Sequence, residues 1–341
     1  MGMDQRDLAD VPSAPTPTPG AVSRALSHKY FYEIALAAVL VVISVALSFM
    51  TPFFMTTQNL LNVLQQVSLT AIVAFGMAFV IISQGIDLSV GAGIALVGVP
   101  AAKVVVALDG TALAIGLGIV VGIAVGALIG LANGLLIVKA RMPSFIATLA
   151  TMSIARGVAL TWTQGQPVFG LPKGFIYLGN GFVGPIPFTV IVMVVVFALA
   201  VWVTEFTSFG RTVYAIGGNE EAARLSGINV NRNRIVIYMI SGMSVGIVGV
   251  MFTGLLASAQ PTAGDPFLFS SITAAILGGV ALFGGSGRMV GVLIGALLIG
   301  VVANGQALLN VDPFLQQVIM GLVVLLAIAV SGLQRGGGQT T

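Results

Sequence analysis

Long apolar runs separated by short polar breaks dominate this chain. A membrane-spanning helix needs about 20 predominantly apolar residues. Ten runs fit that pattern, at residues 31–50, 60–83, 88–108, 112–138, 143–163, 188–206, 235–258, 269–284, 289–310 and 314–333. The pattern predicts an all-α integral membrane protein with about ten transmembrane helices. The shortest breaks, at 85–87 and 284–288, are compatible with either full turns or re-entrant segments.

Composition supports the same class of protein. The chain is 57% hydrophobic and 7% charged, with a mean hydropathy of +1.07, whereas a soluble domain carries about 25% charged residues. It has no cysteine, and its single histidine is His28. Disulfides, zinc sites and a Ser-His-Asp triad are therefore excluded, and we expect neither a metal nor a cofactor.

The basic residues indicate how the chain lies across the membrane. An even number of spans places both termini on one side, and cytoplasmic segments are enriched in Lys and Arg. With the termini inside, the inner segments hold Arg6, Arg24, Lys29, Lys139, Arg141, Arg211, Arg224, Arg232, Arg234, Arg288 and Arg335. The outer loops hold Lys173 with three acids, Asp109, Asp265 and Asp312. We expect both termini to be cytoplasmic. Scattered through short loops, these charges form no surface for nucleic acid.

The chain divides into a tail and one membrane domain. Residues 1–28 are rich in proline, serine and threonine, which predicts a disordered cytoplasmic tail. No cleavage pattern of a signal peptide precedes the first apolar run. Residues 29–335 are expected to form a single transmembrane domain, whose longest cytoplasmic loop is 207–234.

That loop contains the sequence "GNEEAARLSGINV", which has the signals of a short helix. Asn219 is a good N-cap, and Glu220 and Glu221 follow at the positive end of the helix dipole. Gly227 suits the left-handed residue that ends a helix. Two turns are far shorter than the about 12–15 residues that an isolated helix needs in water. The segment therefore needs a partner to dock on it.

The partner surface is expected to be small and apolar, with charge around it. It comprises Asn219, Glu220, Glu221, Ala222, Arg224, Leu225, Gly227 and Ile228. An amphipathic helix lying on lipid headgroups is the alternative, and nearby Arg232 and Arg234 suit lipid phosphates. The glutamates disfavour it, because an anionic membrane surface repels them.

Five blocks of sequence give the chain a family likeness. "GNEEAARLSGINV" resembles the EAA-type loop of ABC importer permeases, specifically the ribose-type sugar permease family. The other blocks are "SQGIDLSVG" (83–91), "FIATLATMSIARG" (145–157), "SAQPTAG" (258–264) and "LFGGSGRMVGVLIGAL" (282–297). They occur in the order of that family, and the likeness covers roughly residues 30–335.

The resemblance implies a permease subunit in the bacterial inner membrane, forming the path for a ribose- or xylose-like monosaccharide. It implies a homodimer of permeases, a cytoplasmic ATP-binding subunit docked on residues 219–228, and an extracytoplasmic sugar-binding protein. The chain has no GxxxxGK[ST] motif of its own, so ATP hydrolysis is expected from the partner and the chain is not an enzyme. The particular sugar, and a pair of unlike permeases, stay open.

Charged residues near the membrane are candidates for function. Asp87 and Arg288 follow glycine-containing breaks and are structural or gating candidates, and Asp87 is equally suited to capping a bend. Arg156 lies about 20 Å from the inner end of its span by helical rise. That depth excludes lipid exposure, leaving either the substrate path or a structural hydrogen-bonding role.

Amide and aromatic side chains suit a neutral sugar. Candidates for its path, besides Arg156, are Asn62, Gln65, Gln66, Trp162, Asn304, Gln306 and Gln316. Interhelical hydrogen bonds and an interfacial tryptophan belt are the alternatives. An ion-coupled secondary transporter of small polar solutes is the alternative function, but it needs acids deep in the bundle. The acids considered for this role, Glu33 and Asp87, both lie at span ends.

Overall fold

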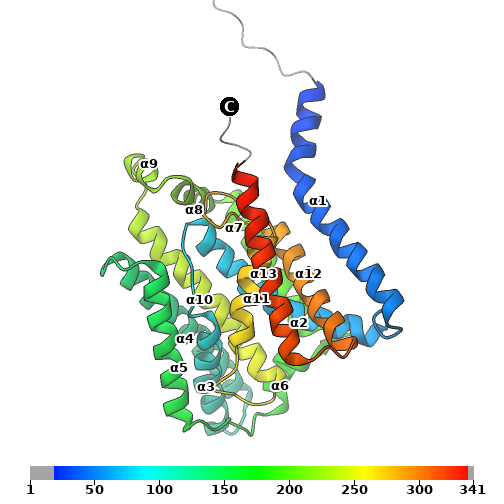
Figure 1. Ribbon diagram of the computed structural model, residues 1–341. Coiled ribbons are helices and arrows are strands. Elements are labelled where there is room, and N and C mark those ends of the chain that lie inside the picture. Colours follow the sequence, from blue (N-terminus) through cyan, green and yellow to red (C-terminus); the bar gives the residue numbers. More distant parts are fainter. Residues whose placement is uncertain (1–18, 337–341) are drawn as a thin grey trace, which may run out of the picture.

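The computed structural model describes the backbone of residues 19–336 and the side chains of residues 31–325. Over this part of the chain it is a helical bundle with one two-stranded hairpin (Figure 1). The elements are α1 (Pro19–Met50), α2 (Thr57–Ile82), α3 (Val90–Ala107), α4 (Ala112–Val138), α5 (Ser144–Thr163), α6 (Lys173–Asn180), β1 (Phe182–Val183), β2 (Ile186–Pro187), α7 (Phe188–Phe206), α8 (Ser208–Gly218), α9 (Glu220–Leu225), α10 (Val230–Leu255), α11 (Asp265–Leu277), α12 (Met289–Leu308) and α13 (Pro313–Gly336).

Eight helices of the described chain are long and apolar enough to cross a membrane: α1 from Phe31, α2, α3, α4, α5, α7, α10 and α12. They correspond to eight of the ten predicted spans. The predicted tail, 1–28, lies outside the described residues up to position 18, and α1 begins within its remainder, at Pro19. The last predicted span, 314–333, falls within α13.

The predicted span at 269–284 has a different form. Its helix, α11, has 13 residues and ends before Gly278, and an irregular connection then leads to α12. Gly279, Gly284 and Gly285 in this connection have φ angles of +85°, +82° and +80°. The left-handed backbone at Gly279 ends the helix, and that at Gly284 and Gly285 turns the connection that follows. This crossing is therefore half helix, whereas hydropathy alone suggests a continuous span.

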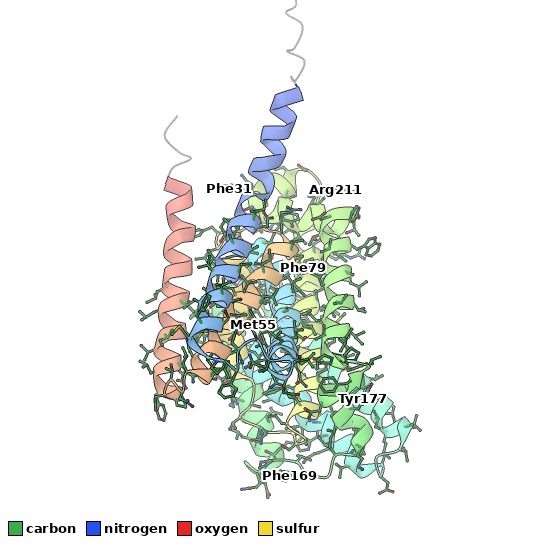
Figure 2. All side chains as sticks on the ribbon, turned by 90° about the vertical axis from the view of Figure 1, so that its right-hand side faces the viewer. Phe31, Met55, Phe79, Phe169, Tyr177 and Arg211 are labelled. Carbon is green, nitrogen blue, oxygen red and sulfur yellow. The ribbon has the colours of Figure 1, made fainter. Side chains whose placement is uncertain are left out.

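The beginning of α1, the end of α13 and the α8–α9 region lie at one end of the bundle, as Figure 1 shows. In Figure 2, Phe31 and Arg211 are near that end, and Phe169 and Tyr177 are near the opposite one. Since Arg211 belongs to the Arg-rich loop, the end with the termini is the cytoplasmic one. This is the predicted sidedness.

α10 is the centre of the bundle and packs against α2, α3 and α4. Its contact with α4 is backbone to backbone: a Cβ built on Gly126 would overlap the Gly242 carbonyl oxygen, and one on Gly130 would overlap the Tyr238 carbonyl oxygen. Small residues allow such an approach between membrane helices. The peripheral helices α1, α4, α5 and α7 are mostly exposed in the single chain.

The two short glycine breaks are turns between helices. Residues 83–89 join α2 to α3, and residues 278–288 join α11 to α12. The irregular half of the crossing that α11 completes is residues 256–264, which follow α10 on the outer side, where Ala259 pairs with Val168. It leads inward to α11, whose first residue, Asp265, lies beside Gly91 of α3.

Candidate functional site

The α9 segment (residues 219–228) forms the predicted short helix. The Asn219 side-chain oxygen accepts the Ala222 N–H at 3.0 Å. At the other end, Gly227 has φ +83° and the Ile228 N–H donates to the Ala223 carbonyl at 3.1 Å. A left-handed glycine with this hydrogen bond is the Schellman ending of a helix. Local sequence therefore determines where α9 begins and ends.

Contacts within the chain hold α9 in place. Ala223 is buried in a small cluster with Ile216 and Val230. Glu220 bonds the guanidinium groups of Arg224 at 2.9 Å and Arg234 at 2.8 Å. Burial raises the pKa of Glu220, but the hydrogen bonds and charges of the two arginines outweigh it and lower the pKa below 4.5. Sequence reasoning missed Ala223 and Arg234, because both depend on how the helix docks.

The outward face of α9 (Glu221, Ala222, Arg224 and Leu225) is exposed. The Leu225 side chain is 81% exposed. Ile228, expected on the same surface, instead packs against the inward cluster. An exposed leucine beside charged groups on a fixed helix is suited to insertion into a protein partner.

Asp87 is buried in a hydrogen-bond network. One carboxylate oxygen accepts the Ser89 N–H at 3.0 Å, and the other accepts the Ser241 hydroxyl of α10 at 2.8 Å. The Asn133 amide of α4 lies 3.4 Å from the first oxygen and 2.8 Å from the Ser89 hydroxyl. Ser89, and not Asp87, is the N-cap residue of α3. Asp87 thus joins the α2–α3 turn to α4 and α10.

Arg156 of α5 forms an ion pair with Asp265, the first residue of α11, and donates to the Pro261 carbonyl at 3.1 Å. Asp265 was expected in an outer loop. Because Arg156 is about 18 Å along α5 by helical rise, its partner must also lie well inside the bundle. The pair lines a groove of about 660 Å³ between α5 and α11, whose other lining residues include Met152, Ser153, Leu160, Leu268 and Phe269.

The predicted amide residues form separate contacts. Asn304 and Asn59 bond each other at 2.8 and 3.0 Å, joining α12 to α2. Gln65 donates to the Gly179 carbonyl of α6 at 2.6 Å, and Gln316 to the nearby Val311 carbonyl at 2.8 Å. These residues therefore contribute to packing between elements or within a turn.

The remaining candidates differ in exposure and in their contacts. Asn62 and Gln66 are exposed on the outer half of α2. Gln306 is buried, and neither of its side-chain polar atoms has a hydrogen-bond partner in the described part of the chain. Trp162 is half exposed and lies under the Lys103 ammonium, 5.5 Å from the ring centre.

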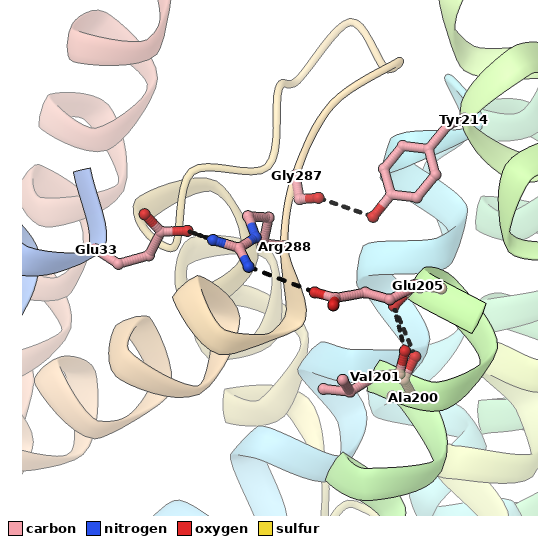
Figure 3. Close-up of polar contacts among 8 residues, drawn as sticks. Glu33, Ala200, Val201, Glu205, Tyr214, Gly287 and Arg288 are labelled. Atoms are coloured by element: carbon pink, nitrogen blue, oxygen red, sulfur yellow. Dashed lines mark hydrogen bonds and ion pairs between the residues drawn. The ribbon is translucent and has the colours of Figure 1, made fainter. Parts of the chain in front are cut away.

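Arg288 lies on the cytoplasmic side, where it bonds Glu33 of α1 at 3.0 Å and Glu205 of α7 at 3.5 Å (Figure 3). The preceding Gly287 carbonyl accepts the Tyr214 hydroxyl of α8 at 2.8 Å. Arg288 therefore ties the α11–α12 connection to α1 and α7, and Gly287 ties it to α8. Glu205 was not among the sequence candidates.

A bundle of spanning helices, with an ion pair in an open groove at membrane depth and a short exposed helix at its cytoplasmic end, is the architecture of a membrane transport component. The chain matches the family described as "Branched-chain amino acid transport system / permease component" over residues 59–328, and it belongs to this family. It is a multi-pass protein of the bacterial inner membrane and a permease component, not an enzyme.

Several curated proteins are similar along most of their length. The ribose import permease protein RbsC of Bacillus subtilis (strain 168) is 47% identical over 85% of this chain and 89% of its own. The protein of the same name in Escherichia coli (strain K12) is 43% identical over 87% and 92%. The D-allose transport system permease protein AlsC of Escherichia coli (strain K12) is 36% identical over 86% and 89%.

Proposed function

We propose that this chain is the permease subunit of an ABC importer that carries a monosaccharide of the ribose or xylose type. The exposed, fixed α9 helix carries this proposal. Support for a sugar comes from the relatives, whose names specify ribose, D-allose and L-arabinose. A neutral sugar also agrees with a membrane domain whose polar candidates are mostly amides.

The outward face of α9 is the contact for a cytoplasmic ATP-binding subunit. Leu225 supplies an apolar side chain, and Glu221 and Arg224 supply the charged rim. Because α9 is capped at both ends and anchored through Ala223, force applied to this face passes to α8 and α10 without unfolding the helix. Lipid is a poor alternative partner, since Glu221 is exposed on the same face.

The groove between α5 and α11 is one wall of the translocation path. The Asp265 side chain is 67% exposed in the single chain, and the Arg156 side chain is 23% exposed. Charged groups at this depth do not face lipid. When a second copy of the chain places its own groove opposite this one, the two grooves together enclose a water-filled path between the permeases. The charged pair then offers hydrogen-bond donors and acceptors to sugar hydroxyl groups.

An extracytoplasmic binding protein delivers the sugar on the opposite side. A depression of about 990 Å³ lies there, lined by Lys103, Trp162, Gln164 and Gln166 among others. An aromatic ring and amide groups suit a sugar arriving from solution. Trp162 thus marks the outer mouth of the path, and Asn62, Gln66 and Gln306 are proposed to lie along its outer half.

The alternative, an ion-coupled transporter, requires a free acid within the bundle. Asp87 is fully engaged by two serines and an asparagine, and Asp265 is paired with Arg156. Neither arrangement leaves a vacant cation or proton site. Energy from ATP is therefore the better-supported source.

The test is reconstitution in liposomes with the ATPase and binding protein encoded beside this gene, with uptake of labelled ribose and xylose as the readout. We expect uptake that requires ATP, and at least a tenfold loss in Leu225→Lys. The matched control is Asn231→Lys, which adds the same charge at an exposed position early in α10. Uptake driven by an ion gradient without ATP, or equal uptake by both variants, would contradict the proposal.

A further inference from the structure

Three segments far apart in the sequence meet at the cytoplasmic end of the bundle. They are the end of α8, the α2–α3 turn and the α11–α12 connection. Figure 1 shows that connection running beside α8. A depression of about 640 Å³ between them is lined by Gln84, Gly217, Gly218 and residues 282–286. The meeting point adjoins α9, because Gly218 precedes the Asn219 cap.

The contacts here are between backbones. A Cβ built on Gly217 would overlap the Ile82 carbonyl oxygen and lie 2.6 Å from the Gly285 nitrogen. The Gly285 N–H donates to the same Ile82 carbonyl at 2.8 Å, and the Gln84 side-chain amide donates to the Gly217 carbonyl at 2.8 Å. We call these four residues (Ile82, Gln84, Gly217 and Gly285) the glycine latch. Only glycine at position 217 permits this approach.

The latch connects α9 to both walls of the groove. On one side, the α2–α3 turn presents the Ile86 carbonyl to the Thr148 hydroxyl of α5 at 3.4 Å and to the Tyr238 hydroxyl of α10 at 3.3 Å. On the other side, Gly285 lies in the connection that follows α11. Thr148 and Arg156 belong to the same helix, and Asp265 begins the other.

We propose that Gly217 is the residue that transmits movement of α9 to the α5–α11 groove, and that the latched segments move as one body. The inference rests on the proposed function, since it assumes that an ATPase moves α9. Its physical basis is that close-packed backbones resist sliding, whereas long side chains adapt. Gly217 is thus a positioning residue for transport. It touches neither the sugar nor ATP.

The first experiment compares two neighbouring glycines in the reconstituted importer. Gly217→Ala introduces the overlap with Ile82, whereas a Cβ on Gly218 meets nothing within 4 Å. We expect Gly217→Ala to bind the ATPase normally and to hydrolyse ATP, but to move at least fivefold fewer sugar molecules per ATP. Gly218→Ala is expected to match the wild type. Equal transport ratios for the two variants would overturn the proposal.

The second experiment does not depend on tolerating an overlap. The chain has no cysteine, and a Cβ on Gly285 lies 3.0 Å from the Gly218 Cα, so cysteines at these two positions are within reach of a short bis-methanethiosulfonate cross-linker without the Cβ geometry of a direct disulfide. If the latch moves as one body, the cross-linked double variant Gly218→Cys, Gly285→Cys keeps uptake within twofold of the same variant without cross-linker. Uptake that stops on cross-linking and returns when reductant cleaves the linker would show that the latch opens.

Failure of the latch is distinguishable from failure of the proposed function. If the wild type shows no ATP-dependent sugar uptake, the proposed function is wrong and neither glycine variant is informative about transport. If the wild type transports sugar but Gly217→Ala keeps the wild-type transport ratio, or the linked cysteine variant loses uptake, then only the proposal for the glycine latch is wrong. Each single-cysteine variant controls for strain at its position, which matters at Gly285 because of its φ of +80°.

Discussion

Replacement of Asp87 by alanine should destabilise the membrane domain. The substitution removes the acceptor of the Ser89 N–H, of the Ser89 hydroxyl and of the Ser241 hydroxyl, all of them buried. A buried polar group left without a partner costs about 1–3 kcal/mol, so three such groups give about 3–9 kcal/mol. Hydrogen bonds between membrane helices average about 0.6 kcal/mol, because the unfolded chain also finds partners in the bilayer. We therefore expect a loss of about 2 kcal/mol.

The measurement is reversible unfolding by denaturant in mixed micelles, for the wild type, Asp87→Ala and Asp87→Asn. The free energy of unfolding is obtained from the midpoint and slope of each transition. The asparagine keeps the shape and one acceptor oxygen, and its amide can donate to the Ser241 oxygen. It should recover more than half of the lost free energy. Glu221→Ala is the control, because it removes an acid that is exposed on α9.

Transport by the same variants shows whether Asp87 acts only as a hydrogen-bond acceptor or whether its negative charge is also needed. If Asp87 only joins the turn to its neighbours, Asp87→Asn transports sugar at a rate close to that of the wild type. A stable but inactive asparagine variant would mean that the negative charge itself is needed. Asp87→Ala with a free energy of unfolding within about 0.5 kcal/mol of the wild type would refute the reasoning about orphaned groups.

Three further expectations concern other contacts. The pKa of Glu220 is lower in the folded protein than its usual value of 4.5, so its ion pairs stabilise α9 above pH 4.5 and are lost as the pH falls through the folded-state pKa. Hydrogen exchange should therefore show constant protection of the α9 amides from pH 7 to 5 and a loss of protection only below pH 4.5. Gly130→Leu should cost about 1–3 kcal/mol or prevent folding, whereas Gly116→Leu, on the same helix with nothing within 4 Å, should give wild-type yields of monodisperse protein. Arg156→Asp should reduce sugar uptake at least tenfold, and Asp265→Arg in the same chain should restore part of it; no restoration would argue against the pair.

The features predicted well from sequence are those that a bilayer or a short segment dictates. Eight spans follow from runs of apolar residues, since lipid excludes unsatisfied polar backbone. The sidedness follows from the loops' basic residues. The α9 boundaries follow from Asn219 and Gly227, whose roles depend on backbone a few residues away. In each case the controlling interaction is local, or is with the solvent.

The irregular segment before α11 illustrates what local pattern does not reveal. "SAQPTAG" (258–264) is polar and carries a proline and a glycine, so hydropathy indicates a loop outside the membrane, with Asp265 beside it. Irregular backbone is tolerated at membrane depth when protein or water, and not lipid, surrounds it. That condition depends on Arg156 and on Gly91, which are more than 100 positions away in sequence. Asp265 was therefore missed as a candidate for the path.

The ion pairs show where the chain uses its few charges. In the described part of the chain, Arg156 joins α5 to α11, Glu220 joins α9 to α10, and Arg288 joins the α11–α12 connection to α1 and α7. Apart from the Glu220–Arg224 pair within α9, each pair bridges two elements, and none lies in the α4–α10 interface, where glycines bring the backbones together. A charge in or near lipid costs free energy unless it is paired. The ion pairs therefore join segments at places where the backbones are not closely packed. The charged contacts accordingly mark junctions at α9, at the groove and at the α11–α12 connection, and the glycine contacts mark the places where backbones are closely packed.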